Sequence, residues 1–375
     1  MKRIQYNAIL RDLHKKMVFL VGPRQAGKTW LAKKIAQSFQ HPTYLNYDKR
    51  EDREIIHDEA WLESTDLLIL DELHKMPNWK TYVKGVFDTK TKHLCILVTG
   101  SARLDTFRSG GESLAGRQFT HHLFPFSPAE LRQTSFVKDI DKFMKRGGFP
   151  EPFLANNDQD ADRWRMQYID GLIREDILDF EHIQNLRAIQ LVLEMLRERV
   201  GSLISYSSIA SDVGVSPTTA RKYIRILESL YIIFCVTPFT KNIARSILKE
   251  PKIYFFDTGM VVDNPGKRFE NMVANCLLKH VYERIDYRGQ RAGLHYLRTK
   301  EGKEVDFCVT QDNIIEYLLE TKYKNKMIDS SLLYFSKKYK LPAIQLAKET
   351  KRERKINEYI TVRRSDQFLP ELFVL

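Results

Sequence analysis

The sequence predicts an α/β protein made of several domains. Three observations support this prediction: short apolar runs alternate with helical patterns in the first third, a glycine-rich loop joins the first run to a helix, and a charged β-hairpin pattern follows a long helical stretch near the C-terminus. At 375 residues, the chain is longer than the roughly 100–200 residues of an ordinary domain, so we expect two or three cores.

The composition excludes several classes of protein. With 43% hydrophobic and 29% charged residues, the chain is neither disordered nor a disulfide scaffold. No apolar run approaches the roughly 20 residues of a membrane span, and MKRIQYNAIL lacks the apolar stretch of a secretion signal, so we expect a cytoplasmic protein without membrane contact. The net charge of +12 suits either a nucleic-acid partner or a solvated lysine-rich surface.

The strongest motif is GPRQAGKT, which lies between the apolar run 17–21 and a helical pattern. It matches G-x-x-x-x-G-K-[ST] in the strand–loop–helix context that this motif requires. The loop N–H groups and the helix N-terminus then face nucleotide phosphates, Lys28 reaches the β- and γ-phosphates, and Thr29 binds Mg²⁺. The predicted ATP-binding residues of the loop are Gly22, Pro23, Arg24, Gln25, Ala26, Gly27, Lys28 and Thr29.

An acidic pair follows the predicted strand Leu67–Leu70, and another strand is predicted at Thr43–Asn46. Ligands of α/β proteins bind at the carboxyl ends of parallel strands. We therefore expect Asp71 to hold Mg²⁺ through water and Glu72 to polarise the attacking water. The alternative is an ordinary strand end with two acids.

Polar residues also follow the predicted strand Cys95–Thr99, in the stretch TGSAR. Thr99 and Ser101 are candidates for contact with the γ-phosphate or the attacking water, or else they form a plain turn. Arg117 precedes another β-like stretch, 118–123. It is either an arginine finger for the nucleotide of a neighbouring subunit or a solvated surface residue.

A resemblance to a known family adds to these predictions. The chain resembles a prokaryotic family of AAA+-type ATPases in the stretches GPRQAGKTWL, LILDELHKMPNW, VTGSARL, SLAGRQ, FPFSPAEL, RGGFPEP and KIYFFDTG. In that family the ATPase is fused to a winged helix and a C-terminal nuclease-like domain. The resemblance covers the chain nearly end to end. It implies a ring or other homo-oligomer, and it supports Arg117 as the finger.

Together, the motifs and the resemblance divide the chain into four parts. These are a P-loop ATPase core (1–132), a helical lid (133–199), a winged helix-turn-helix (200–250) and a PD-(D/E)-x-K nuclease-like domain with a restriction-endonuclease-like α/β fold (251–375). In the lid, apolar side chains at helical spacing are expected to form core stripes. They are Trp164, Tyr168, Leu172, Ile173, Leu191, Met195 and Leu196.

The stretch 203–238 has the helix–turn–helix–strand pattern of a winged helix. A short helix ends at Gly214, Ser216 is the expected N-cap of the next helix, and Pro217 fits its first position. The basic residues expected to face outward on that helix and the following loop are Arg221, Lys222, Arg225, Lys241, Arg245, Lys249 and Lys252. They contact DNA phosphates, or the winged helix serves only for protein packing.

In the last third, a predicted hairpin brings acids and a lysine together. Asp306 and Glu320 are 14 positions apart, so an odd-length turn would place them opposite each other on one face. Pairing Glu320 with Glu304 instead keeps Asp306 on that face. Lys322 shares the face of Glu320, and an acid beside E-x-K is the arrangement of the PD-(D/E)-x-K nucleases.

This arrangement suits metal-dependent cleavage of a phosphodiester. Two carboxylates hold a Mg²⁺ or Mn²⁺ ion, the ion acidifies a water, and Lys322 orients that water. Glu270, on a predicted amphipathic helix at 266–285, completes a metal set with Asp306 and Glu320. The alternative is a solvated charged hairpin, although unpaired carboxylates inside the apolar runs VDFCV and YLLETK would be costly.

The leading hypothesis is an ATP-hydrolysing protein that binds and processes DNA, with a metal-dependent DNA endonuclease domain that acts on branched structures. One alternative is a regulatory nucleotide switch whose C-terminal domain recruits partners without cutting. Another is a DNA-binding ATPase without nuclease activity. The expected cofactors are ATP and Mg²⁺, with Mg²⁺ or Mn²⁺ at the nuclease site, and the expected partners are DNA and further copies of the chain.

Overall fold

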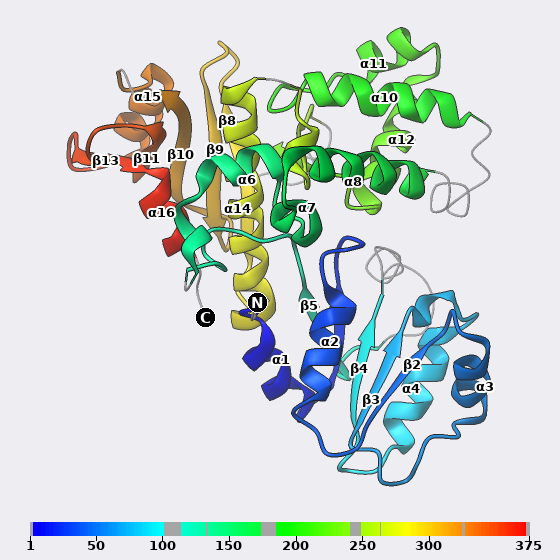
Figure 1. Ribbon diagram of the computed structural model, residues 1–375. Coiled ribbons are helices and arrows are strands. Elements are labelled where there is room, and N and C mark those ends of the chain that lie inside the picture. The colour runs from blue at the N-terminus through cyan, green and yellow to red at the C-terminus, as the bar shows by residue number, and fades with distance from the viewer. Residues whose placement is uncertain are drawn as a thin grey trace. The chain divides into compact units, whose positions relative to one another are not determined.

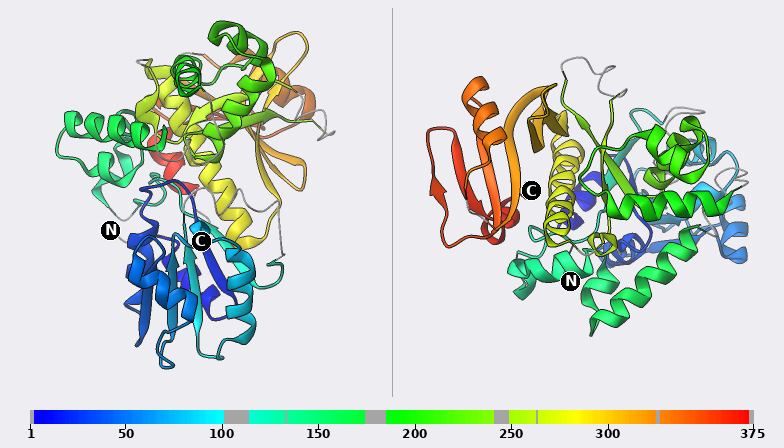
Figure 2. Two further views of the ribbon diagram at one scale, coloured as in Figure 1. Left: turned by 90° about the vertical axis from the view of Figure 1, so that its right-hand side faces the viewer. Right: turned by 90° about the horizontal axis from the view of Figure 1, so that it is seen from above.

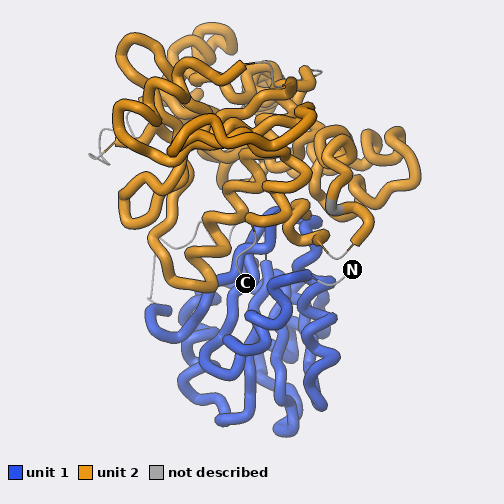
Figure 3. Tube along the Cα trace, turned by 90° about the vertical axis from the view of Figure 1, so that its left-hand side faces the viewer, with its two compact units in different colours: residues 1–124 blue, residues 125–375 orange. Residues whose placement is uncertain are grey.

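A computed structural model describes residues 3–100, 114–132, 134–173, 185–240, 249–262, 264–324 and 327–372 (Figure 1, with two further views in Figure 2). The chain divides into two compact units, Met1–Phe124 and Pro125–Leu375 (Figure 3). The four-part division is finer than this and stays a prediction. The predicted site residue Ser101 lies outside the described residues, as do Lys241 and Arg245. Among the helices that the structure describes, none is long and apolar enough to cross a membrane.

The first unit is built on a parallel sheet. Its described strands are β1 (Met17–Val21), β2 (Pro42–Asn46), β3 (Leu67–Asp71), β4 (Cys95–Thr99) and β5 (Gln118–His122). They lie in the order β2-β3-β4-β1-β5, and each neighbouring pair is parallel. The predicted strands of this region are confirmed. Because β4 lies between β1 and β3, its end stands between the glycine-rich loop and the acidic pair (Figure 1).

Helices cover both faces of this sheet. They are α1 (Tyr6–Leu13), α2 (Lys28–Ala36), α3 (Arg50–Asp58), the 3₁₀ turn η1 (Leu73–Lys75) and α4 (Trp79–Thr89). Leu70 packs in one apolar cluster with Val83 of α4, whereas Ile69 packs in another with Leu31 of α2. Successive residues of a strand are therefore buried on opposite faces of the sheet, and for this reason the strands are continuous apolar runs.

The second unit begins with helices, as predicted. These are η3 (Ser135–Lys138), α6 (Ile140–Arg146), α7 (Pro150–Leu154), α8 (Asp158–Gly171) and α10 (Leu186–Glu198). Trp164 and Tyr168 stack at 4.7 Å between ring centroids in the predicted core stripe. The prediction for Leu191 is wrong, since this residue is 46% exposed. The buried face of α10 is rotated from the predicted one and carries Ala188, Ile189, Val192, Leu193 and Leu196.

Two helices and a hairpin follow, namely α11 (Tyr206–Val213), α12 (Pro217–Ser229), β6 (Ile233–Pro238) and β7 (Lys252–Phe255). The predicted helix ends are confirmed. Gly214 closes α11 with a φ of +73°, and the Ser216 side chain accepts a hydrogen bond from the Thr219 N–H at 3.0 Å. β6 begins at Ile233, after Tyr231 turns the chain with a φ of +56°. β6 and β7 are antiparallel, and Leu203 forms a bridge with Lys252.

The remaining elements are η5 (Thr258–Met260), α14 (Pro265–Arg288), β8 (Ala292–Arg298), β9 (Glu304–Gln311), β10 (Ile314–Lys324), α15 (Ser330–Tyr339), β11 (Ala343–Glu349), β12 (Arg354–Lys355), β13 (Ile360–Arg364) and α16 (Ser365–Glu371). The described strands from β6 onward form one sheet in the order β12-β13-β11-β10-β9-β8-β6-β7. α14, yellow in Figure 2, packs against β7 to β10. The hairpin after α12 and the C-terminal strands thus share a continuous sheet.

Candidate functional site

The glycine-rich loop joins β1 to α2 in a shape that only glycine allows at its first position. Gly22 has a φ of +137°, and a Cβ atom there would lie 2.5 Å from the carbonyl oxygen of Leu123. Gly27 has a φ of +96° at the start of α2. Arg3, which is 3% exposed, braces the loop by donating from Nη1 to the Ala26 carbonyl at 3.3 Å. Arg3 lies outside every motif, so its role is not predicted by the sequence.

The Lys28 side chain lies inside this loop. Its Nζ donates to the carbonyl oxygens of Gly22, at 3.0 Å, and Pro23, at 2.6 Å. Burial lowers the pKa of Lys28 to about 8, and the nearby carboxylates of Glu72 and Asp71 partly oppose this shift. Lys28 therefore presents a poorly solvated positive charge where the motif predicts phosphate groups.

The Asp71 carboxylate gathers hydroxyl groups from three other elements. Thr29 on α2 donates to its Oδ2 at 2.9 Å, and Tyr44 on β2 donates to the same oxygen at 2.7 Å. Thr99 on β4 donates to Oδ1, so the hydroxyl predicted to face the γ-phosphate is held on Asp71. Tyr44 is not predicted by any sequence motif, because only the pairing of β2 with β3 in the sheet brings its hydroxyl to Asp71.

Glu72 lies directly after β3, where the chain turns with a φ of +56°. Its N–H donates to the Thr99 carbonyl at 3.0 Å, which fixes it beside the end of β4. Burial, followed by the negative charge of Asp71, raises the pKa of the Glu72 carboxyl. A raised pKa makes this carboxylate a better proton acceptor. The loop, the acidic pair and Thr99 therefore meet at one edge of the sheet, and their residues fit a nucleoside triphosphate with Mg²⁺.

Arg117 lies just before β5 and forms a two-pronged ion pair within its own chain. Its Nε is 2.8 Å from Oδ1 of Asp88, and its Nη2 is 3.0 Å from Oδ2 of the same residue. Asp88 belongs to α4. A role for Arg117 as a finger on another subunit would require it to leave Asp88, and this role stays a prediction.

A second group of charged residues gathers on the C-terminal sheet; we call Glu270, Glu304, Asp306 and Glu320, with Lys252 and Lys322, the carboxylate cluster. Leu319 pairs with Phe307 across β9 and β10, and the next pair in this register is Glu320 with Asp306. The Asp306 N–H also donates to Oε2 of Glu320 at 3.2 Å. Of the two predicted pairings, the one with Asp306 opposite Glu320 is therefore present.

The turn that produces this register differs from the predicted odd-length turn. Gln311 pairs with Ile314, so the turn has two residues, Asp312 and Asn313, with φ of +51° and +61°. An even turn alone would place Glu320 on the face of the sheet opposite to that of Asp306. A bulge between Ile315 and Tyr317 inserts one residue and returns Glu320 to the face of Asp306.

The bulge residue, Glu316, is held by α14. Nη1 of Arg284 lies 2.5 Å from Oε2 of Glu316, and Nη2 lies 2.8 Å from Oε1. Arg284 also binds the side chains of Gln290 and Gln311. This contact between α14 and β10 fixes the position of the extra residue.

Lys252 is a correction to the sequence analysis, which placed it among exposed loop residues. It begins β7 and is 1% exposed. Its Nζ lies 2.8 Å from Glu304 Oε1, 3.3 Å from Asp306 Oδ1 and 3.7 Å from Glu270 Oε1. Burial opposes the charge of Lys252, but these three carboxylates outweigh it and raise its pKa.

Lys322 neutralises the other side of the cluster. Its Nζ lies 2.8 Å from Glu320 Oε1 and 3.0 Å from Oδ2 of Asp329, which caps α15. Burial, followed by the charge of Asp306, raises the pKa of Glu320. Burial and the charge of Asp306 likewise raise the pKa of Glu270. Tyr254 donates to Glu270 at 2.7 Å.

The predicted metal ligands Glu270, Asp306 and Glu320 thus gather around two ammonium groups. Over the described ranges, no group of three or more His, Cys, Asp or Glu side chains is arranged to hold a metal ion. The physical reason lies in Lys252, whose ammonium group stands among the carboxylates that a divalent ion would need. In this arrangement the residues do not fit such an ion.

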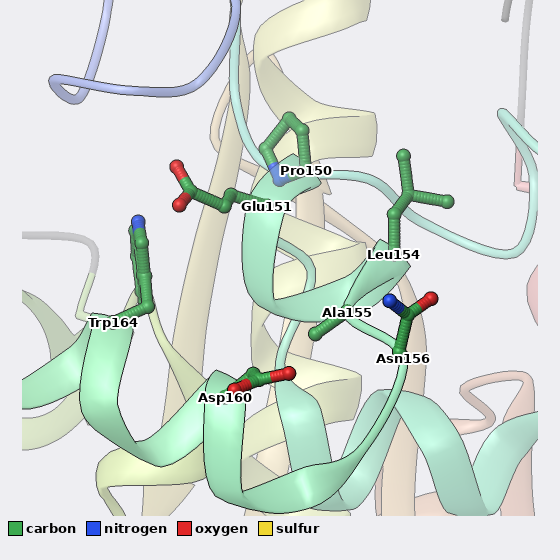
Figure 4. Close-up of a pocket in the computed structure, with 7 residues that line it drawn as sticks. All are labelled: Pro150, Glu151, Leu154, Ala155, Asn156, Asp160 and Trp164. Carbon is green, nitrogen blue, oxygen red and sulfur yellow. The ribbon is translucent and has the colours of Figure 1, made fainter.

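A separate pocket of about 500 Å³ lies between α7 and α8. Its lining residues are Pro150, Glu151, Leu154, Ala155, Asn156, Asp160 and Trp164 (Figure 4). None of the predicted site residues lines this pocket.

Three sequence-family models match successive parts of the chain. Residues 14–132 match an AAA domain, residues 137–264 match a domain of unknown function (DUF8612), and residues 265–367 match another domain of unknown function (DUF4143). The first match contains the whole glycine-rich loop and the acidic pair. The N-terminal unit is a P-loop ATPase domain of the AAA type. The other two matches carry no activity with them.

Curated relatives extend the similarity beyond this domain. An uncharacterized protein of Mycobacterium tuberculosis is 29% identical over 254 residues, which are 67% of this chain and 56% of that protein. The chain thus spans little more than half the length of this relative. An uncharacterized protein of Methanocaldococcus jannaschii is 24% identical over 364 residues, covering 85% of this chain and 79% of that protein.

Two of the matching solved structures have low sequence identity to this chain. A Walker-type ATPase of Pyrococcus abyssi has a TM-score of 0.46 at 14% identity, covering 69% of this chain and 94% of its own. The RuvB Holliday junction branch migration motor of Thermotoga maritima has a TM-score of 0.32 at 17% identity, covering 66% and 93%. The ATPase assignment therefore rests on the P-loop residues and the AAA match.

Proposed function

We propose that the chain hydrolyses ATP and uses this activity to act on DNA. The observation that carries the first part is the Asp71 carboxylate, which accepts hydrogen bonds from Thr29 on the P-loop helix at 2.9 Å and from Thr99 on β4. Such a carboxylate beside a P-loop threonine is placed to hold Mg²⁺ with the nucleotide.

Each residue of this site has a separate task. Lys28 and the loop N–H groups would bind the phosphates. Thr29 and Asp71 would hold Mg²⁺, which would screen the negative charge of the phosphates. Glu72, with its raised pKa, orients and polarises the attacking water. Thr99 fixes the Asp71 carboxylate so that these groups keep their positions.

Hydrolysis is tested by measuring phosphate release. Lys28→Ala should abolish nucleotide binding, whereas Glu72→Gln should keep binding and lose most of the turnover, since the amide cannot accept a proton. If both variants hydrolyse ATP at the rate of the unaltered protein, the assignment is wrong.

We propose that α10, α11, α12 and the β6–β7 hairpin form a winged helix that contacts DNA, so that it extends at both ends beyond the predicted range 200–250. Three helices, a bridge at Leu203 and a hairpin are the parts of that fold. Lys222 and Arg225 on α12 are exposed, whereas the Arg221 guanidinium lies over the Tyr206 ring at 4.8 Å. The two exposed side chains are therefore the candidates for phosphate contact.

DNA binding is tested by measuring affinity for linear and branched duplexes at several salt concentrations. The double variant Lys222→Gln/Arg225→Gln should weaken binding and lower the salt slope by about two, because two phosphate contacts are lost. A matched control, Lys337→Gln/Lys340→Gln, removes the same charge from exposed sites at α15. Equal loss in both variants would show a nonspecific charge effect and would reject α12 as the contact.

Self-association is a further part of the proposal, with Arg117 as the finger in a ring or other homo-oligomer. Light scattering with and without ATP measures the assembly. Arg117→Ala should lower turnover while nucleotide binding is kept. Turnover that does not depend on protein concentration or on Arg117 would contradict the finger.

The sequence also predicts a metal-dependent DNA endonuclease. The register that sets Asp306 opposite Glu320, with Lys322 two residues further on, agrees with that prediction. The Lys252 ammonium group among the carboxylates opposes it. Incubation with linear and branched DNA and Mg²⁺ or Mn²⁺ tests it. Cleavage that is lost in Glu320→Gln but kept in Lys28→Ala would establish it.

A further inference from the structure

We propose that Lys252 is the permanent cation of the carboxylate cluster and takes the place of a divalent metal, so that the C-terminal domain neither binds such a metal there nor cuts DNA. This inference concerns only the cluster, and the proposed ATP hydrolysis and α12 contact with DNA do not depend on it.

The position of the ammonium group carries the proposal. Lys252 Nζ lies within 2.8 to 3.7 Å of Glu304, Asp306 and Glu270, which come from β9 and α14. An ammonium group has three N–H donors, so one lysine can serve the three carboxylates. A divalent ion bound between these oxygens would lie against the ammonium group, and the two positive charges would repel each other strongly because Lys252 is 1% exposed.

The remaining carboxylate oxygens of the β9–β10 hairpin are also occupied by protein donors. Oε2 of Glu304 accepts from Arg298 at 2.6 Å. Oδ2 of Asp306 accepts from both the N–H and the hydroxyl of Thr321, at 3.0 and 2.7 Å. A metal ion would have to displace these donors as well.

Both oxygens of Glu320 are occupied in the same way. Oε1 accepts from Lys322 at 2.8 Å, and Oε2 accepts from the Asp306 N–H at 3.2 Å. These ion pairs and hydrogen bonds form a network that occupies both oxygens of Glu304, Asp306 and Glu320. In this network Lys322 pairs with Glu320 and with Asp329.

The network also has a mechanical consequence. Lys252 begins β7, which pairs with the strand that follows α12. Its ion pairs reach β9 and α14, so they fasten the hairpin of the proposed winged helix to the C-terminal sheet. Lys252 is thus a positioning residue between these two parts of the second unit.

Binding of Mn²⁺, added as the chloride, tests the proposal by electron paramagnetic resonance without nucleotide. The unaltered protein and Asp306→Asn should bind Mn²⁺ equally, because ions bound elsewhere are common to both. Lys252→Met should gain a site at least tenfold tighter, and adding Asp306→Asn should remove it. Lys300→Met, which removes an exposed lysine in the turn between β8 and β9, should behave as the unaltered protein.

Lys252→Met leaves three carboxylates around an uncharged side chain, and this variant can fail to fold. Lys252→Met/Glu304→Gln removes one charge of each sign, so it keeps the charge balance of the cluster and serves for the same Mn²⁺ measurement. Mn²⁺ bound by the unaltered protein and lost in Asp306→Asn would overturn the proposal. DNA cleavage with Mn²⁺ that is lost in Glu320→Gln would overturn it as well.

Discussion

Gly22→Ala tests whether the packing of the glycine-rich loop is set by its first residue. The added Cβ would lie 2.5 Å from the Leu123 carbonyl oxygen, whereas ordinary contact begins at 3.4 Å, so the two groups must separate by 3.4 − 2.5 = 0.9 Å. The Leu123 N–H donates to Val21 at 2.8 Å, so this shift pulls on the ladder between β1 and β5.

Two costs add for this substitution. A non-glycine residue at a φ of +137° costs roughly 1–3 kcal/mol, and overpacking costs roughly 1–3 kcal/mol more. The free energy of unfolding of the first unit should therefore fall by roughly 2–6 kcal/mol. The affinity for Mg²⁺–ATP should fall as well, because the loop N–H groups move.

Denaturant unfolding followed by tryptophan fluorescence measures the change, since Trp30, Trp61 and Trp79 lie in the first unit. Gly85→Ala is a matched control. A Cβ at Gly85 in α4 meets nothing within 4 Å, so alanine should stabilise that helix by about 1 kcal/mol. An unchanged midpoint and unchanged ATP affinity in Gly22→Ala would refute this account of the loop.

Three further predictions each concern the substitution of one residue. Tyr44→Phe removes a donor to Asp71 at 2.7 Å and should slow phosphate release about fivefold, for a loss of about 1 kcal/mol; an unaltered rate would contradict this role. Glu316→Ala should lower the free energy of unfolding by about 1 kcal/mol, because its pair with Arg284 is partly exposed, and denaturant unfolding measures the loss. Burial lowers the pKa of His280 from 6.5 to about 4, so the unfolded chain takes up a proton in this window that the folded chain does not, and stability falls as pH falls from 6.5 towards 4. In His280→Phe the melting temperature should fall less over that range, and an equal fall would reject this histidine as a cause.

The parallel sheet of the first unit was predictable from local patterns. A strand buried on both faces has to be an apolar run, and the P-loop requires a strand before it and a helix after it, so β1, β3 and β4 follow from their own residues. The helix caps at Gly214 and Ser216 are also local, since each depends on one residue and its neighbours. Leu191 shows the limit, because helical spacing alone does not decide which face of a helix packs inward.

The residues that link separate elements were decided by the tertiary structure. Tyr44 reaches Asp71 only because β2 pairs with β3, and Arg3 reaches the loop from the start of the chain. Lys252 lies in a basic stretch that suggested an exposed loop, whereas in the structure it belongs to β7 and is buried among carboxylates. Such contacts join chain segments that are far apart in the sequence, so no local pattern predicts them.

The register of the C-terminal hairpin shows most clearly which features the sequence determines and which the tertiary structure decides. The sequence by itself determined that acids and a lysine share two neighbouring strands, because alternation along a strand is a local property. It did not determine whether Asp306 and Glu320 share a face, since one inserted residue reverses that answer. The bulge at Glu316, held by Arg284 of α14, decided it, because this ion pair forms only when helix and sheet pack together.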